Sequence, residues 1–236
     1  MNLKKDKVTA IILAAGSGSR MNMNCTKQKL NIRGKTLIKR CVEVFDKSFM
    51  VDSIIVVCKE DEKDFIKNEV SEFRKVISFI NGGKCRAESA KAGFEQIPTD
   101  TDFVLIHDAA RCLITESEIE NVILGAIKNG AATASVPVVD TIKKCSPDGV
   151  VLETLDRSSL MSIQTPQVFS VDIYRKALEA SSELTSSITD DNMLVEAIGV
   201  KVHCVKTLPT NIKITTENDL YTAEFIIAKR EEEDTL

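Results

Sequence analysis

Short apolar runs alternate with longer amphipathic stretches along this chain, and this alternation constrains the fold more than any single motif. The apolar runs are rich in Val, Ile and Leu, as buried parallel strands are. In the first half of the chain they occupy residues 8–15, 53–58, 76–80 and 103–110. Apolar residues between them recur at intervals of three and four, which predicts helices at residues 35–49, 60–75, 86–97 and 115–129. We therefore expect an α/β fold with a Rossmann-like, doubly wound, mostly parallel sheet.

The pattern changes after a further apolar run at residues 131–140. Two short β-prone segments flank the turn sequence Ser-Pro-Asp-Gly at 146–149, so residues 141–156 are predicted to form a hairpin. Such a hairpin either covers an edge of its own subunit or reaches across to a partner subunit. Further strands are expected at residues 162–168, 201–206 and 212–215, and a final helix at 217–232. We interpret residues 1–236 as a single domain with a β-hairpin arm, residues 137–158, inserted within it.

The distribution of charge argues against a nucleic-acid partner and favours a smaller anion. A formal net charge of -4 does not suit a protein that covers a phosphate backbone. No acidic residue lies between Asp6 and Glu43, although that stretch is rich in basic residues. These are Lys7, Arg20, Lys27, Lys29, Arg33, Lys35, Lys39 and Arg40. The stretch is either a solvated basic face or a docking site for an anion.

The cysteines, histidines and hydropathy exclude several other classes of protein. The seven cysteines form no Cys-x-x-Cys pair and the chain has only two histidines, so the spacing of zinc ligands is absent. No apolar run reaches the roughly 20 residues that a membrane-spanning helix needs. The N-terminus lacks the apolar stretch of a signal peptide. We therefore expect a cytoplasmic protein with reduced thiols and no membrane partner.

A glycine-rich segment directly follows the first predicted strand and carries the clearest chemical signal. Residues 13–30 read LAAGSGSRMNMNCTKQKL. Gly16 and Gly18 permit the backbone to approach a ligand closely, and Arg20 and Lys27 can supply positive charge to phosphate oxygens. The segment is therefore either a phosphate-binding loop with cationic side chains or a plain tight turn.

Two familiar glycine motifs do not fit these residues. A dinucleotide fingerprint needs a glycine or alanine where Met21 stands, and a P-loop ending at residues 34–36 needs a glycine where Lys29 stands. The segment instead resembles the signature of nucleotidyltransferases that activate sugars and polyols, in which a glycine-rich loop is followed by an arginine and then by a Pro-Lys pair. Thr26 replaces that proline here, while Lys27 keeps the expected spacing.

Further motifs narrow the resemblance to the 2-C-methyl-D-erythritol 4-phosphate cytidylyltransferases of the non-mevalonate isoprenoid pathway. They are GGKCRAES (82–89), HDAAR (107–111), VPVVDT (136–141), DRSSL (156–160), ITDDNMLVEAIG (188–199) and NIKITTENDL (211–220). The resemblance implies a CTP site made by the glycine-rich loop and the GGKCRAES element. Its residues would be Ala14, Ala15, Gly16, Ser17, Gly18, Gly82, Gly83 and Ser89. Without the resemblance, Gly82 and Gly83 form an ordinary strand-to-helix turn.

The HDAAR motif ends a predicted strand, at the edge where open α/β sheets bind ligands. The resemblance implies that Asp108 holds Mg²⁺, an ion that needs few carboxylates because it keeps water and bridges substrate phosphates. Ala109 and Arg111 are implied to contact the second substrate, and Cys112 stands where the family usually has proline. From the residues alone, Asp108 is instead a cap of the next helix.

The remaining motifs are implied to bind the acceptor, a polyol phosphate. In the family the hairpin arm crosses to the neighbouring subunit of a homodimer, and Thr141 and Arg157 match its substrate-binding positions. Thr189 and Lys213 match further positions on the acceptor side. The resemblance thus predicts a homodimer whose active site is shared between subunits.

Simpler interpretations of the same residues stay open. Arg157 is otherwise a surface residue paired with Asp156 or Glu153, a contact that contributes little stability. Thr189 and Thr216 are otherwise helix N-caps. A capped helix N-terminus is itself an anion site, so the two interpretations of Thr189 are compatible.

The implied reaction is an in-line displacement, in which a phosphate oxygen of the acceptor attacks the α-phosphorus of CTP and pyrophosphate leaves. Arg20, Lys27, Arg157 and Lys213 are the predicted catalytic cations. Two rival functions are a cytidylyltransferase for another polyol phosphate, such as ribitol 5-phosphate, and a catalytically idle nucleotide-binding or scaffold protein. Loss of Arg20, Lys27 or Asp108 would mark the idle protein, and all three are present.

Overall fold

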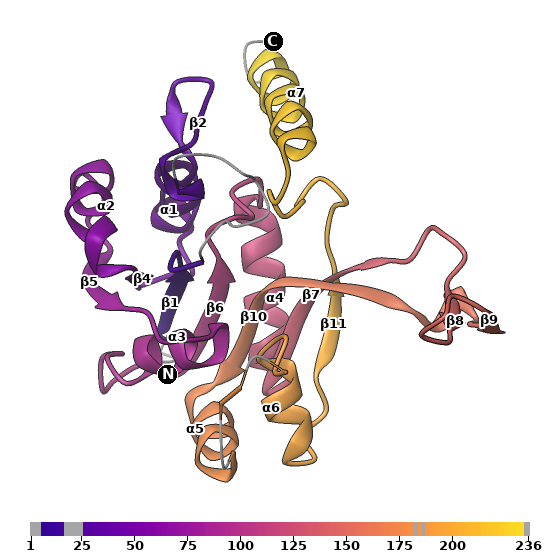
Figure 1. The fold of residues 1–236 in the computed structure, drawn as a ribbon. Helices are drawn as coiled ribbons and strands as arrows, with labels where there is room; N and C mark the ends of the chain where they lie inside the picture. The colour runs from indigo at the N-terminus through magenta and orange to yellow at the C-terminus, as the bar shows by residue number, and fades with distance from the viewer. Residues whose placement is uncertain (1–5, 17–25, 182–183, 186, 234–236) are drawn as a thin grey trace.

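A mostly parallel sheet forms the centre of the molecule (Figure 1). The computed structural model describes residues 6–16, 26–181, 184–185 and 187–233, and within them a seven-stranded sheet runs in the order β11-β7-β10-β6-β1-β4-β5. Its strands are β1 (Val8–Leu13), β4 (Ser53–Cys58), β5 (Val76–Asn81), β6 (Phe103–Asp108), β7 (Ala131–Pro137), β10 (Met161–Ser170) and β11 (His203–Lys206). β10 is antiparallel to β6 and β7, and the other neighbouring pairs are parallel. The predicted α/β fold with a mostly parallel, doubly wound sheet is confirmed.

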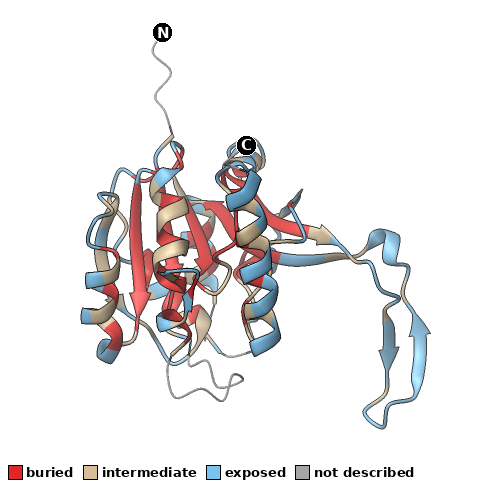
Figure 2. Cartoon of the chain, turned by 90° about the horizontal axis from the view of Figure 1, so that it is seen from above, coloured by how far each residue is buried: buried red, intermediate tan, exposed pale blue. Residues whose placement is uncertain are grey.

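Successive side chains of β1 enter two separate hydrophobic cores, one on each face of the sheet. Ala10 and Ile12 belong to one core, and Ile11 and Leu13 to the other. A strand buried on both faces has no polar side, which explains its continuous apolar sequence. Figure 2 shows the sheet strands as the buried centre between exposed helix surfaces.

The helices divide between these two cores. α1 (Leu37–Lys47), α2 (Lys63–Glu69), α4 (Glu116–Asn129) and α7 (Glu217–Glu233) pack on the first core, and α3 (Arg86–Phe94), α5 (Val171–Ala180) and α6 (Asn192–Ala197) on the second. The predicted capping box of α4 is present, because the Thr115 hydroxyl accepts from the Glu118 N–H while the Glu118 carboxylate accepts from the Thr115 N–H. Within the described residues, no helix is both long and apolar enough to cross a membrane.

Three predicted elements differ from the structure. Lys35 and Thr36 form strand β3, paired with β2 (Asn31–Ile32), and Thr36 caps α1 rather than lying inside it. The helix predicted to reach residue 75 ends at Glu69, where the Ser71 hydroxyl donates to the Asn68 carbonyl and the chain turns into β5. Residues 212–215 form no strand. Ile214 is buried as expected of an alternating segment, but its N–H bonds to the Ala110 carbonyl without a strand ladder.

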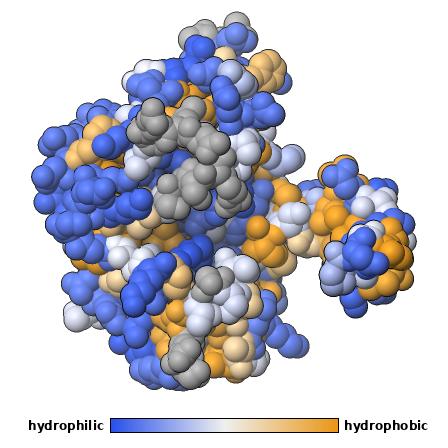
Figure 3. Space-filling model, in the orientation of Figure 1, coloured by the Kyte–Doolittle hydropathy of each residue, from blue (hydrophilic) through white to orange (hydrophobic). Residues whose placement is uncertain are grey.

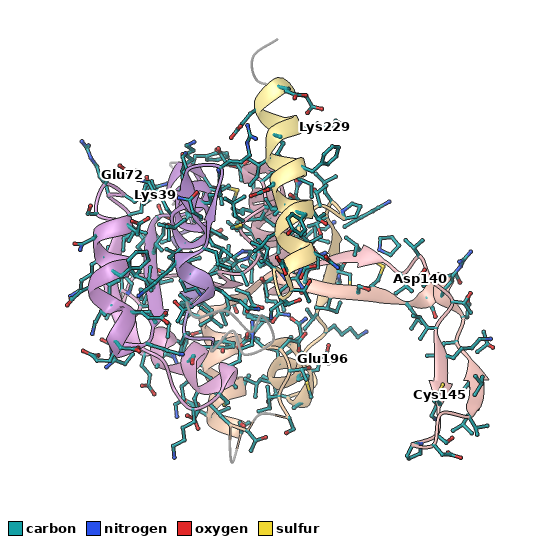
Figure 4. The ribbon with its side chains drawn as sticks, turned by 45° about the horizontal axis from the view of Figure 1, so that its top comes forward. Lys39, Glu72, Asp140, Cys145, Glu196 and Lys229 are labelled. Atoms are coloured by element: carbon teal, nitrogen blue, oxygen red, sulfur yellow. The ribbon has the colours of Figure 1, made fainter. Side chains whose placement is uncertain are left out.

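The predicted hairpin is present as an arm that projects from the body (Figures 1 and 4). Strands β8 (Lys143–Cys145) and β9 (Val151–Thr154) pair antiparallel, and a short 3-10 helix, η4 (Arg157–Ser159), follows. Gly149 has φ 86°, the left-handed conformation that the turn requires. Figure 4 places Asp140 near the base of the arm and Cys145 in its outer part. The arm therefore does not cover an edge of its own subunit.

Candidate active site

A cavity of about 500 Å³ opens at the carboxyl ends of β1, β4, β5 and β6. It lies at the edge where open α/β sheets bind ligands, because the segments that leave these strands meet there. Among the described residues that line it, the cations are Lys27, Lys59, Lys84, Arg86 and Lys213, and the carboxylate is Asp108. The excess of positive charge suits a polyanionic ligand such as a triphosphate.

Two glycines form part of the cavity wall for different reasons. A Cβ on Gly16 would meet no heavy atom within 4 Å, so the backbone there is open to a ligand. A Cβ on Gly82 would lie 2.4 Å from the Ala15 Cβ, closer than real atoms approach. Glycine at position 82 therefore lets the turn after β5 pack directly on the turn after β1.

The Ser89 side chain stabilises the same turn and keeps a limited capacity for a ligand. Its hydroxyl accepts from the Gly83 N–H at 3.1 Å and donates to the Cys85 carbonyl at 2.9 Å. A serine hydroxyl has one proton and two lone pairs, so one lone pair is left over. Ser89 can accept a hydrogen bond from a base amino group, which is the hydrogen-bonding group that distinguishes cytosine from uracil.

Asp108 is the electrostatic centre of the cavity. Arg86 Nε donates to its Oδ1 at 3.0 Å, and Lys213 Nζ donates to its Oδ2 at 2.6 Å. Burial disfavours the charged carboxylate, but the Arg86 and Lys213 cations outweigh burial and hold the pKa of Asp108 well below its usual range. Asp108 is therefore ionised, and it caps no helix because Thr115 caps α4.

Lys27 reaches the cavity from the short 3-10 helix η2 (Lys27–Lys29). It is buried, and its Nζ donates to the Ile214 carbonyl at 3.1 Å, next to Lys213 in the chain. The neighbouring Gln28 donates to the Ala14 carbonyl at 2.9 Å and so ties η2 to the end of β1. These contacts bring the ammonium groups of Lys27 and Lys213 to one cavity although the two residues lie far apart in the chain.

His107 supports the backbone around Asp108 through hydrogen bonds at both ring nitrogens. The Arg111 carbonyl can only accept, so His107 Nε2 carries the imidazole proton and donates to it at 3.2 Å. His107 Nδ1 then accepts from the Thr165 hydroxyl at 3.1 Å, and that hydroxyl accepts from the Asp108 N–H. Burial lowers the pKa of His107 to about 3, so the ring is neutral in the folded protein.

The buried His107 should make folding stability depend on pH below 6.5. Its pKa is about 3 in the fold and 6.5 ordinarily, so below pH 6.5 the unfolded chain binds the extra proton. The free energy of unfolding should fall by about 1.4 kcal/mol per pH unit from pH 6.5 toward pH 4. Urea denaturation of wild type and His107→Gln at several pH values measures this slope. The slope should diminish in His107→Gln and persist in the exposed control His203→Gln; equal slopes in all three proteins would contradict this role.

The family of the chain follows from a comparison with known proteins. Residues 8–229 match the family model described as 2-C-methyl-D-erythritol 4-phosphate cytidylyltransferase. The chain belongs to this family. Proteins with that name from Alkaliphilus oremlandii and Clostridium acetobutylicum are 38% and 40% identical to it over 229 and 223 residues. The alignments cover 96% and 93% of this chain and 97% of each relative.

Solved structures agree with this family assignment. The crystal structure of 4-diphosphocytidyl-2C-methyl-D-erythritol synthase from Anaerococcus prevotii superimposes with a TM-score of 0.83 at 28% identity, covering 95% of this chain and all (100%) of that one. The 2-C-methyl-D-erythritol 4-phosphate cytidylyltransferase from Thermus thermophilus gives a TM-score of 0.76 at 27% identity, covering 94% of this chain and 99% of that one. This cytidylyltransferase is thus an enzyme of the nucleotidyltransferase class.

Many residues predicted for the site of this cytidylyltransferase line the cavity. They are Ala15, Gly16, Lys27, Gly82, Gly83, Ser89, Asp108 and Lys213. Ala14 and Ala109 are buried beside it, and their N–H groups donate to the carbonyls of Val57 and Leu13. Ser17, Gly18 and Arg20 lie outside the described residues.

Other predicted residues lie away from this cavity. Arg111 is partly buried, and its Nη1 donates to the Asn211 carbonyl at 2.8 Å. Thr141 and Arg157 are exposed on the arm. Arg157 Nη1 donates to the Val139 carbonyl at 2.7 Å, and the structure shows no ion pair to Asp156 within the described residues. Thr141 and Arg157, which were predicted to bind the acceptor, therefore do not line this cavity.

Of the two threonines predicted as possible N-caps, Thr216 caps a helix and Thr189 does not. The Thr216 hydroxyl accepts from the Asp219 N–H, as an N-cap of α7 does. Thr189 caps no helix, because α6 begins after Asp191, and the Thr189 hydroxyl contacts Met193 Sδ at 3.3 Å. The exposed position of Thr189 leaves it accessible to a ligand.

Sequence reasoning assigned no role to Arg86, which the structure places at the centre of the charge network. Arg86 lies in the GGKCRAES motif at the first position of α3 and bonds Asp108 and Asp191. A helix-terminal arginine is usually solvated, and its partners lie 22 and 105 residues away in the chain. Only the motif itself could have drawn attention to it.

Proposed function

We propose that this cytidylyltransferase transfers CMP from CTP to 2-C-methyl-D-erythritol 4-phosphate, giving 4-diphosphocytidyl-2-C-methyl-D-erythritol and pyrophosphate, in the cavity described above. The observation that carries the proposal is the convergence of Lys27, Asp108 and Lys213 on one cavity from distant parts of the chain. Family membership supplies the identity of the substrates. The cations that line the cavity support its choice as the site.

The residues of the cavity fit a direct in-line displacement. A phosphate monoester is already largely ionised near neutral pH, its second pKa being about 6, so the attacking oxygen needs no general base. The neutral, buried His107 agrees with this, since it cannot exchange a proton with a substrate. The main barrier is the repulsion between two polyanions, which cationic side chains lower by stabilising the charge that develops. We assign this stabilisation to Lys27 and Lys213, and to Arg20 from the sequence.

Mg²⁺ fits the donor set as a proposed cofactor. Within the described residues no group of three or more His, Cys, Asp or Glu side chains could hold a metal. Mg²⁺ commonly binds through one carboxylate, phosphate oxygens and water, so the ionised Asp108 is sufficient. Asp108 would hold the ion, and Lys213, whose Nζ donates to Asp108 Oδ2 and whose side chain is 39% exposed, lines the same cavity. When bound, Mg²⁺ would neutralise part of the triphosphate charge.

The arm supports a homodimer with shared active sites, which we also propose. Val139, Val150, Val151 and Leu152 on the arm are between 55% and 80% exposed, and apolar side chains are visible along it in Figure 3. Exposed apolar residues on a projecting hairpin are typical of an interface with another chain. Because Arg157 lies on the same arm, a crossing arm would carry it toward the cavity of the partner.

Mixed dimers test this sharing of sites. Arg157→Ala should mainly raise the KM for the acceptor, and Lys27→Ala should abolish most turnover in its own cavity. If the arm crosses, a heterodimer of the two variants contains one cavity with both Lys27 and Arg157 intact, so activity should return toward half of wild type per dimer. Verified heterodimers whose activity at limiting acceptor is no higher than the mean of the two parent variants would show that each site is formed within one subunit.

Product analysis tests the proposed reaction directly. The protein is incubated with CTP, Mg²⁺ and either 2-C-methyl-D-erythritol 4-phosphate or ribitol 5-phosphate, and the CDP-linked product is detected by mass. We expect product and pyrophosphate in equal amounts with the first acceptor and a much lower kcat/KM with the second. A preference for ribitol 5-phosphate would overturn the choice of acceptor, and no product with either would overturn the function.

We also propose a cytoplasmic location. The described cysteines form no disulfides, and Cys145 and Cys204 are exposed thiols. Exposed unpaired thiols suit a reducing compartment.

A further inference from the structure

A second carboxylate lies behind the cavity, completely buried. Asp191 has 0% exposure and stands at the start of α6. Its Oδ2 accepts from Arg86 Nη1 at 2.5 Å, and its Oδ1 accepts from the Tyr174 hydroxyl at 2.6 Å. Burying a charge without partners costs several kcal/mol. The buried Asp191 carboxylate therefore depends on its hydrogen bonds to both Arg86 and Tyr174.

Tyr174, one of the two partners of Asp191, is closely packed among aromatic rings. The Tyr174 ring is fully buried, stacks on Phe169 at 5.4 Å between centroids and meets the edge of Phe94 at 5.0 Å. Burial and the Asp191 charge raise the pKa of Tyr174, so its hydroxyl stays a donor. The Tyr174 hydroxyl thus fixes one oxygen of Asp191 and leaves the other for Arg86.

Arg86 joins this buried pair to the cavity. Its Nη1 bonds Asp191 and its Nε bonds Asp108 Oδ1, so the planar guanidinium is held at two points. Its side chain is 22% exposed, against 39% for Lys213 on the other oxygen of Asp108. Asp108 therefore has one more buried partner, Arg86, which is bonded at two points, and one more exposed partner, Lys213.

We propose that Asp191, oriented by Tyr174, is a positioning residue that holds Arg86 against Asp108 Oδ1 and so fixes the orientation of the Asp108 carboxylate, the group that would hold the metal. This rests on the proposed function of the cavity. Asp191 touches no substrate and acts through Arg86. Outer partners of this kind commonly change metal affinity or activity by about 10–100-fold when they are replaced.

Hydrogen bonds other than those of the carboxylate hold the backbone at Asp191. The role of the carboxylate can therefore be tested by substitution without displacing the chain. The Asp191 N–H donates to Gln167 Oε1 at 2.9 Å, and Gln167 Nε2 donates to Asp190 Oδ2 at 3.0 Å. The segment is thus anchored on β10 independently of the Asp191 carboxylate. An Asp191→Asn substitution should leave the chain path intact and remove the charge that holds Arg86.

The experiment compares wild type with Asp191→Asn and Tyr174→Phe. Controls are Asp172→Asn, at an exposed aspartate, and Tyr221→Phe, at the other tyrosine of the chain, which is also exposed. In Asp191→Asn we expect the Mg²⁺ concentration for half-maximal activity to rise about tenfold or more and kcat to fall, with little change in the KM for CTP. Tyr174→Phe, which keeps the ring packing, should shift the same quantities less far.

A measurement that needs no substrate separates a positioning role of Asp191 from a role in fold stability alone. The side-chain Nε–H NMR signal of Arg86, assigned by its loss in Arg86→Lys, reports whether the guanidinium is held. It should broaden or shift in Asp191→Asn and Tyr174→Phe and stay unchanged in both controls. Unchanged signal and metal dependence in folded Asp191→Asn would overturn the proposal, as would a loss of activity explained entirely by a lower fraction of folded protein. If wild type itself makes no product, the proposed function fails, while the NMR signal still tests the positioning.

Discussion

Replacing Lys27 by alanine is expected to lower turnover by about a hundredfold or more, as loss of a comparable electrostatic stabiliser does in other enzymes. Lys27 is buried in the cavity wall, with its ammonium bonded to the Ile214 carbonyl and so held near Lys213. A cation held in place before the reaction stabilises developing charge without reorganisation, which is why its loss should appear in kcat. A steady-state assay of pyrophosphate release measures the effect.

Two further variants make the Lys27 result interpretable. Lys27→Met retains the apolar stem and should be nearly as slow as Lys27→Ala if the charge is what matters. Lys29→Ala removes a lysine from the same short helix, one whose ammonium lies 5.1 Å from the Phe65 ring centre, and should keep near-normal turnover. Arg20→Ala is expected from the sequence to resemble Lys27→Ala. Near-normal turnover of Lys27→Met would remove Lys27 from the mechanism.

Asp108→Asn is expected to lower turnover about as much as Lys27→Ala, but by weakening the binding of Mg²⁺. The substitution removes the charge that pairs with both Arg86 and Lys213 and that we assign to Mg²⁺. Turnover should fall by about a hundredfold or more. Replacing a residue that only bonds to a metal ligand can already lower activity by up to about a hundredfold, and Asp108 is the proposed ligand itself. Raising the Mg²⁺ concentration should restore part of the activity if the metal also binds through the triphosphate.

Binding of CTP without metal distinguishes these two large effects. Asp108 carries a negative charge that repels a triphosphate, so Asp108→Asn should bind metal-free CTP as tightly as wild type or more tightly. Lys27→Met should bind it more weakly. Calorimetric titration measures both affinities. Weaker metal-free binding by folded Asp108→Asn would mean that Asp108 has a different part in the site.

The layered sheet was predictable because buried parallel strands and amphipathic helices have strong local patterns. Residues 53–58 and the capping box at Thr115 were placed correctly for this reason. The strand predicted at residues 212–215 is absent. The alternation of apolar residues there indicates which side chains are buried, but a strand also needs a neighbouring strand to pair with. The hairpin was predicted from its turn sequence, while its projection from the body depends on packing that no local pattern encodes.

The sequence predicted those site residues that lie in a motif whose residue types indicate phosphate or metal binding. Gly16 follows the end of β1 and Asp108 ends β6, and the sheet brings those strand ends together. Lys27 was found from its spacing in the glycine-rich motif. The link from Arg86 to Asp191 and Tyr174 was missed because it depends on side chains far apart in the chain and on the burial of an aspartate. Lys59 also lines the cavity without belonging to any of the motifs, and Lys84 lines it from the GGKCRAES motif, where no role was assigned to it. Long-range pairing of this kind becomes visible only in the folded chain.

A crystal structure of the protein with CTP and Mg²⁺ tests the central claim most directly. We expect the triphosphate in the cavity, within hydrogen-bonding distance of Lys27 Nζ and Lys213 Nζ, with the metal on Asp108 and Arg86 still bonded to Asp191. Nucleotide bound elsewhere on the protein, or in the cavity with its triphosphate directed away from these side chains, would contradict the account.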